Sequence, residues 1–231
     1  MTNVFVFTLK VGRGLKYEGH QLEELGLAAL LHDIGYGRIP PEIRQACRPL
    51  TPEEMHEIQA HPAYGHEILL TSLGEAHKQL AEIVLQTHER ENGQGYPHGL
   101  KGREIHEYAK IIGISDVFEA LTHSRPHRKR LLPYEAVKEI LSSQRHLFPS
   151  NIFKILIQEM SVFPIYSYVR LNSGAIGRVI ATEANQPLRP TVEILCDSEG
   201  KRVEGGKIIR LVETSLLHIT GLVDEKEIAE G

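Results

Sequence analysis

The chain of 231 residues has no tryptophan, only two cysteines and no apolar run of the roughly 20 residues that a membrane-spanning helix needs. Cys47 and Cys196 lie far apart and lack the spacing of metal ligands, so we predict a reduced, cytoplasmic setting. The formal charge of −4 lacks the basic excess of proteins that bind nucleic acids. We therefore expect neither a membrane nor a nucleic acid polymer among its partners.

What the chain does contain is histidine, 13 residues in all. Many imidazoles beside few thiols favour hard or borderline metal ions over soft ones, if the protein binds a metal. The hydrophobic fraction of 41% and the charged fraction of 24% are those of an ordinary globular protein. The length is sufficient for one large domain, or for a main domain with an appendage.

Helical periodicity dominates the first 160 residues, where apolar residues recur at steps of three and four. Thr51, Pro52 and Glu54 form a capping box that predicts the start of one helix. The predicted helices cover residues 20–33, 50–70, 76–89, 108–122, 133–144 and 151–160. The opening residues 4–9 suit a strand or a helix start equally well. We therefore predict a mainly α domain over residues 1–160.

The pattern changes after Pro164. Short β-branched runs are separated by turn clusters such as Asn172-Ser173-Gly174. They predict a small antiparallel β module over residues 162–222, followed by a charged tail at 223–231. Packing or oligomerisation is the simpler interpretation of this module, and a second ligand site is the alternative.

Polar residues interrupt the apolar stripes of four predicted helices. His32 and Asp33 continue one stripe, and His61, His88 and Asp116 lie on three others. A single buried histidine is usually satisfied within the core, but a buried carboxylate must be paired, protonated or bound to a metal. Imidazoles and carboxylates that converge from four helices therefore predict a metal site, and this donor set suits Fe, Mn or Zn.

Several ordered motifs carry a family resemblance. They are His-Asp-Ile-Gly at 32–35, Leu-Thr-Pro-Glu-Glu at 50–54, Gly-Tyr-Pro at 95–97, Gly-Leu-Lys-Gly at 99–102 and Asp-Val-Phe-Glu-Ala-Leu-Thr at 116–122. The chain resembles the HD superfamily of metal-dependent phosphohydrolases. Within it, the chain is similar to the HD-GYP family of cyclic di-GMP phosphodiesterases, over about residues 3–140.

The resemblance implies an HD-type helical bundle with a metal centre that activates a water for attack on a phosphodiester. The implied metal ligands are His32, Asp33, His61, His88 and Asp116. Asp33, which can bridge two ions, and Tyr96 are the implied catalytic residues. The implied cofactor is one or two divalent transition metal ions, Fe or Mn in the first place and Zn or Ni after them.

The resemblance also implies substrate-binding residues and partners. Arg125 and Arg128 stand where the family has cations near the substrate phosphates, which a guanidinium fits well, although a solvated basic loop is the alternative. Gly95 and Pro97 flank Tyr96 in a loop beside the site, and in the family this loop also contacts diguanylate cyclase domains. The predicted partners are thus a cyclic dinucleotide substrate, a cyclase domain and a second copy of the chain.

Four positions depart from the family pattern. The first histidine ligand would fall one position before Met1, and a gene start further upstream would restore it. The usual pair of histidines is Thr87-His88, the lysine after His-Asp-Ile-Gly is Tyr36, and the acid before the glycine-rich loop is Asn92. Fewer protein ligands predict weaker metal binding and slower turnover.

Three functions follow from this mixture. The first is a metal-dependent phosphodiesterase that hydrolyses cyclic di-GMP to pGpG, GMP or both. The second is a catalytically impaired domain that senses a nucleotide or docks a cyclase domain. The third is an HD-type phosphohydrolase that acts on another nucleotide.

Overall fold

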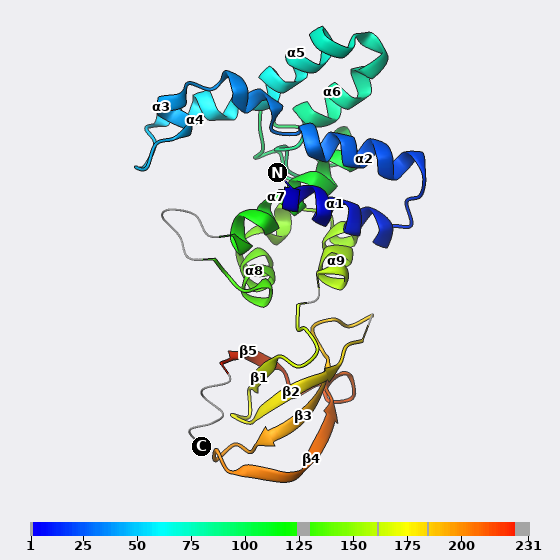
Figure 1. The fold of residues 1–231 in the computed structure, drawn as a ribbon, viewed down its shortest axis with the longest axis vertical. Coiled ribbons are helices and arrows are strands. Elements are labelled where there is room, and N and C mark those ends of the chain that lie inside the picture. Colours follow the sequence, from blue (N-terminus) through cyan, green and yellow to red (C-terminus); the bar gives the residue numbers. More distant parts are fainter. Residues whose placement is uncertain (1, 124–129, 161, 184, 225–231) are drawn as a thin grey trace. The chain divides into compact units, whose positions relative to one another are not determined.

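The computed structural model of the protein describes residues 2–123, 130–160, 162–183 and 185–224. Contacts between residues divide the chain into two units, Met1–Arg130 with Ile140–Leu156, and Leu131–Glu139 with Ile157–Gly231. The first unit is helical and the second contains an antiparallel sheet (Figure 1), which confirms the predicted fold class. The predicted domain boundaries, 1–160, 162–222 and 223–231, stay predictions.

The helical unit contains α1 (Thr2–Gly14), α2 (His20–Leu31), α3 (Pro41–Arg44), α4 (Pro52–Gln59), α5 (His61–Leu73), α6 (Lys78–Leu85), α7 (Glu107–Thr122) and most of α9 (Ser150–Glu159). Shorter turns join them: η1 (Ile34–Arg38), η2 (Glu75–His77), η3 (Gly102–Glu104), η4 (Ile140–Gln144) and η5 (Arg145–Leu147).

The opening residues, which suited a strand or a helix, form helix α1. Val4, Thr8 and Val11 are buried at steps of four and three, as one face of a helix requires. Phe7 meets Phe118 of α7 edge to face, with the ring centroids 5.3 Å apart. Packing against α2 and α7 therefore decides a local sequence that propensity left open.

The predicted helix over residues 50–70 is two helices, α4 and α5, so the prediction of one continuous helix is wrong. The capping box is confirmed: the Glu54 amide donates to Thr51 Oγ1, and the Thr51 amide donates to the Glu54 carboxylate. The break follows from Pro62, which has no N–H to give to the Ile58 carbonyl and whose ring would clash with that carbonyl in a continued helix. His61 consequently begins α5 instead of lying mid-helix.

The predicted helix over residues 76–89 ends early. Helix α6 stops at Leu85, so His88 lies in the irregular segment beyond it and not on an apolar helical stripe. A glycine-rich loop then leads through η3 to α7. Both corrections move a histidine away from the middle of a helix: His61 lies at the start of α5, and His88 lies just beyond the end of α6.

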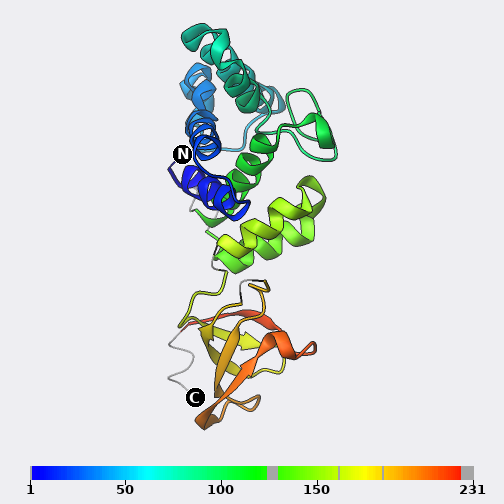
Figure 2. The ribbon, with the colours of Figure 1, turned by 90° about the vertical axis from the view of Figure 1, so that its right-hand side faces the viewer.

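The second unit is a five-stranded antiparallel sheet in the order β4-β3-β2-β1-β5, which Figure 2 shows turned by 90°. Its strands are β1 (Tyr168–Leu171), β2 (Ile176–Ala181), β3 (Thr191–Cys196), β4 (Arg202–Arg210) and β5 (Ile219–Val223), with η6 (Leu211–Glu213) before the last. Helix α8 (Pro133–Glu139) belongs to this unit, since the Tyr134 hydroxyl donates to the Ile219 carbonyl at 3.1 Å. None of the described helices combines the length and the apolar character needed to cross a bilayer.

Candidate metal centre

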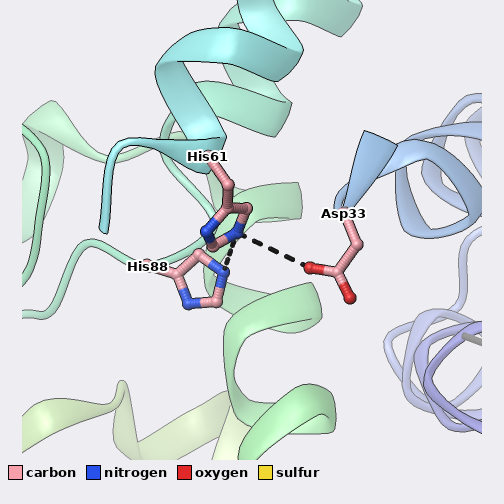
Figure 3. Close-up of side chains that lie close together, drawn as sticks. All are labelled: Asp33, His61 and His88. Carbon is pink, nitrogen blue, oxygen red and sulfur yellow. Dashed lines mark hydrogen bonds and ion pairs between the residues drawn. The ribbon is translucent and has the colours of Figure 1, made fainter. Parts of the chain in front are cut away.

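Three side chains from separate segments meet at helix ends of the first unit (Figure 3). Asp33 follows α2, His61 begins α5, and His88 lies three residues beyond α6. The Nε2 atoms of His61 and His88 are 3.0 Å apart, and Asp33 Oδ1 lies 3.6 Å from His61 Nε2. Ligand atoms of all three lie within 4.8 Å of one another. Small side-chain shifts would bring such donors to about 2 Å from a shared ion.

The backbone orients the ring of His61. Its Nδ1 lies 2.7 Å from the Ile58 carbonyl oxygen, which can only accept, so the neutral ring carries its proton on Nδ1. This is the carbonyl that Pro62 leaves without a helical donor. The lone pair on Nε2 then faces His88 and Asp33. A ring fixed in this way is typical of a metal-ligating histidine.

His32 repeats this arrangement on the other side of Asp33. The side chain is fully buried, and Nδ1 donates to the Ala29 carbonyl at 2.8 Å. Nε2 lies 3.2 Å from Asp33 Oδ2 but makes no well-aligned hydrogen bond to any residue in the described ranges. Buried imidazole lone pairs in close contact with a partly buried carboxylate repel it unless a proton or a cation lies among them. The residues present therefore fit a divalent metal ion.

The pKa shifts leave three donors in the form that binds metal. Burial raises the pKa of Asp33, but the close contact with His32 and the charge of His32, with the neighbouring imidazoles, lower it below its ordinary value. Burial lowers the pKa of His61 and, assisted by the charge of His61, holds the pKa of His88 well below its usual range. Metal binding needs an ionised carboxylate and neutral imidazoles, and these groups have those forms at neutral pH.

Gly35 brings Asp33 next to His61. A Cβ atom on Gly35 would lie 1.9 Å from the His61 carbonyl oxygen and 2.6 Å from the Gly65 amide nitrogen. Any side chain at this position would push η1 away from α5. The glycine of the His-Asp-Ile-Gly motif thus permits the close packing that sets the separation between carboxylate and imidazole.

Asp116, the fifth predicted ligand, lies on α7 and acts on this cluster through its charge. Burial lowers the pKa of His32, but the close contact with Asp33 and the charge of Asp33, together with the charge of Asp116, raise it above its ordinary value. The group of donors within 4.8 Å contains Asp33, His61 and His88. Ligand roles for Asp116 and His32 stay predictions.

Two tyrosine rings cover the imidazoles. The Tyr96 ring stacks on His88 with centroids 4.9 Å apart and planes at 5°, and the Tyr36 ring packs on His61 at 4.2 Å and 34°. Burial, with the phenol of Tyr36, raises the pKa of Tyr96, so its hydroxyl keeps the proton. Position 36, a lysine in the family pattern, is therefore a ring that packs on a candidate ligand. The catalytic role of Tyr96 stays a prediction.

Thr87 stands where the family has a second histidine. The side chain is 1% exposed, and its hydroxyl donates to the Val84 carbonyl at 3.0 Å, close to the end of α6. A neutral hydroxyl with its only proton given to the backbone is a weak metal ligand. The Thr87 side chain instead satisfies a backbone carbonyl in the last turn of α6.

Sequence reasoning missed Glu89, which anchors the Gly-Tyr-Pro loop. This carboxylate is 4% exposed and accepts from the amides of His98 at 2.7 Å and Leu100 at 3.0 Å. Gly95 lies so close that a Cβ there would be 2.5 Å from the His88 carbonyl oxygen. The available signal is a carboxylate shortly before a glycine-rich stretch, because the amides of an ordered loop need an acceptor.

The predicted substrate-binding residues are only partly described. Arg125 and Arg128 lie outside the described residues. Gly95 and Pro97 lie in the loop that Glu89 anchors, and the Tyr96 amide donates to the His88 carbonyl at 3.2 Å. The contacts of Gly95 and Pro97 with substrate stay predictions, but the hydrogen bond of Tyr96 joins their loop to His88, a candidate ligand.

Comparison with known proteins assigns the class. A family model described as "HD domain" matches residues 4–152, and one described as "KOW domain associated with HD domain" matches residues 168–231. The first match covers more than half of the chain. The chain therefore belongs to the HD-domain family, and the residues matched by the KOW model include the five strands of the sheet unit.

Its relatives within the family are of the HD-GYP type, which confirms the resemblance found in the sequence. The chain is 30% identical over 198 residues to the cyclic di-GMP phosphodiesterase PA4108 of Pseudomonas aeruginosa, which covers 86% of this chain and 47% of that protein. It is 34% identical over 162 residues to the 3'3'-cGAMP-specific phosphodiesterase 3 of Vibrio cholerae, with 70% and 35% covered. The chain thus spans about half, or less, of the length of these relatives.

A solved structure has the same fold. Bd1817, an HDG"Y"P protein from Bdellovibrio bacteriovorus, superposes with a TM-score of 0.55 at 21% identity, over 67% of this chain and 49% of that one. At this identity the similarity shows the fold alone.

Proposed function

We propose that the protein is a metal-dependent phosphodiesterase that hydrolyses cyclic di-GMP to pGpG, GMP or both. The observation that carries the proposal is the cluster of Asp33, His61 and His88, with their ligand atoms within 4.8 Å of one another. The names of the relatives as cyclic di-GMP and 3'3'-cGAMP phosphodiesterases support the substrate class.

The residues of the cluster have distinct tasks in this proposal. Asp33, His61 and His88 bind the ion, with His32, whose Nε2 lies 3.2 Å from Asp33 Oδ2, and Asp116 as further ligands. A bound divalent ion supplies Lewis acidity to a phosphate oxygen and lowers the pKa of the attacking water. Tyr96, which keeps its proton, donates a hydrogen bond to the substrate phosphate in this proposal. Fe or Mn suits this histidine and carboxylate set, with Zn or Ni as alternatives.

A second candidate function is a binding module without turnover. Its support is the replacement of a cation by the Tyr36 ring and of a ligand by Thr87, whose hydroxyl is bonded to the backbone. Such a domain would sense a nucleotide or dock a diguanylate cyclase domain through the Gly-Tyr-Pro loop. A phosphohydrolase for another nucleotide is a third candidate, since one relative is named for 3'3'-cGAMP. We also propose that the protein forms a homodimer and is located in the cytoplasm.

The test is metal content and hydrolysis in the same preparation. Protein loaded with Fe(II) or Mn(II) without oxygen is analysed by mass spectrometry for bound metal, and by chromatography for products of cyclic di-GMP and 3'3'-cGAMP. We expect about one to two bound ions and release of pGpG. His61→Asn should lose metal and activity together. His56→Asn, an exposed histidine on α4, is the matched control and should keep both.

The outcomes separate the candidates. Metal-loaded protein that binds cyclic di-GMP without cleaving it would support the binding module. Cleavage of 3'3'-cGAMP in place of cyclic di-GMP would support the third candidate. Undiminished metal binding by His61→Asn would remove the cluster as the metal centre.

A further inference from the structure

A cleft opens beside Asp33, between the end of α2, the turn η1 and helix α3. Its volume is about 570 Å³, within the usual range of small-molecule sites. It is lined by Leu30, Leu31, Asp33, Ile34, Tyr36 and Arg44. Because Asp33 is also a donor of the candidate metal centre, a molecule in this cleft would reach the metal centre with one end.

Arg44 gives the cleft a cation that forms no ion pair with any acid in the part of the chain that the structure describes. Its Nη1 donates to the neutral carbonyl of Tyr36 at 3.2 Å, which ties the guanidinium to the turn after Asp33. The neighbouring arginines differ, since Arg38 pairs with Glu67 and Arg48 with Glu54. A guanidinium has five N–H donors, so one bond to a carbonyl leaves the capacity to bind an anion.

The remaining lining is apolar. Leu30, Leu31 and Ile34 provide aliphatic surface, and Tyr36 contributes a ring that packs on His61. An aliphatic and aromatic wall beside one arginine has the chemistry of a nucleotide site, where the base packs on the wall and the phosphate meets the guanidinium.

We infer that this cleft binds the second nucleotide unit of a dinucleotide, with Arg44 on the phosphate that is not being cleaved. The inference rests on the proposed function and adds the position of that unit. A dinucleotide has two phosphates, and when one lies at the metal centre, the other is one nucleoside away. Arg44 thereby supplies, from α3, the positive charge that Tyr36 does not.

The experiment compares two substrates that share a scissile diester. Cyclic di-GMP has a second phosphate and two bases, whereas bis(p-nitrophenyl) phosphate has neither. Arg44→Gln should raise the KM for cyclic di-GMP about tenfold or more and leave kcat nearly unchanged, because a charge-assisted contact is lost away from the reacting atoms. Hydrolysis of bis(p-nitrophenyl) phosphate should be unchanged, and Arg44→Lys should restore part of the KM.

Arg38→Gln is the matched control, since Arg38 is also exposed but pairs with Glu67 and does not line the cleft. It should leave both substrates unaffected. An equal loss on both substrates, or no change on the dinucleotide, would overturn the inference.

The inference can fail separately from the proposed function. If the metal-loaded wild type cleaves nothing, calorimetry with pGpG takes the place of the kinetics. Arg44→Gln should then bind pGpG about tenfold more weakly than the wild type. Equal affinities, or no binding of pGpG by the wild type, would overturn the cleft as a nucleotide site.

Discussion

The helical unit and the sheet unit bury different kinds of side chain. The helical unit buries His32, His61, His88 and Glu89 in its interior. Among the described residues of the sheet unit, the buried side chains are apolar or cysteine apart from Thr191. Burial alternates along most of β3, as expected for a strand with one face turned to an apolar core.

The difference in buried side chains between the two units shows which buried groups serve stability and which serve another purpose. Burying imidazoles and carboxylates costs free energy that apolar side chains of the same size would not cost. The sheet unit instead keeps charges near its surface, as in the pair of Arg178 and Glu193 at 2.7 Å. Polar groups inside the helical unit are therefore explained by what they bind and orient, and substitutions can test that interpretation.

The strongest effect is expected from Asp33→Asn, which keeps the shape and removes the charge. Loss of the carboxylate should lower metal content and reduce kcat/KM about 100-fold or more, because ligands contribute more than residues that only orient them. The melting temperature of the metal-free protein should change little. Asp197→Asn, in a turn of the sheet unit, is the control and should leave activity unchanged. If Asp33→Asn lowered the stability of the metal-free protein as strongly as its activity, the interpretation that Asp33 serves metal binding would be wrong.

Gly35→Ala should come next. Its Cβ would lie 1.9 Å from the His61 carbonyl oxygen, so η1 must move away from α5. We expect a loss of about 2 kcal/mol of stability in denaturant unfolding, together with weaker metal binding. Gly37→Ala is the matched control two residues away, since a Cβ there meets nothing within 4 Å. Equal effects of the two substitutions would show that close packing at Gly35 does not set the site.

Glu89→Gln tests a buried acid that anchors a loop. The amide side chain offers one acceptor oxygen in place of two, so one of the bonds from the His98 and Leu100 amides is lost. A hydrogen bond to a charged acceptor contributes about 1.5 kcal/mol, so hydrogen exchange at one of these amides should accelerate about tenfold. Unchanged exchange at both amides would contradict the anchoring role.

The smallest effect is expected from Glu54, a partly exposed acid at the start of α4. The hydrogen bonds from Arg48 and from the Thr51 amide lower its pKa from 4.5 to about 2. The folded value lies below the unfolded one, so this contribution to stability is complete above pH 4.5 and is lost as the pH falls towards 2. In an NMR titration, Arg48→Gln should move the midpoint up towards 4.5. An unmoved midpoint would rule out the pair as the cause.

The sequence predicts most of the helical segments and the β module, and it names the three residues whose ligand atoms lie together, Asp33, His61 and His88. The apolar pattern over residues 108–122 predicts α7 correctly, because this helix is buried along most of its length. Helix ends were less predictable. His61 and His88 were assigned to helix faces, because a stripe of apolar residues continues in the sequence past the point where Pro62 or the end of α6 stops the helix.

Contacts between segments that are distant in the sequence could not be predicted from it. The approach of η1 to α5 at Gly35 depends on backbone atoms 26 and 30 residues further along, at His61 and Gly65. The cleft beside Asp33 is formed by Leu30 and Arg44 only after the turn reverses the chain between them. Such features follow from tertiary packing, which no local pattern encodes.

The three converging donors share one trait: each lies at a helix terminus or within three residues of one. Termini fray more readily than helix centres, so the donors meet only while the ends of α2, α5 and α6 remain wound at the same moment. A shared ion would couple the fraying of all three, and its departure would loosen one whole end of the bundle at once.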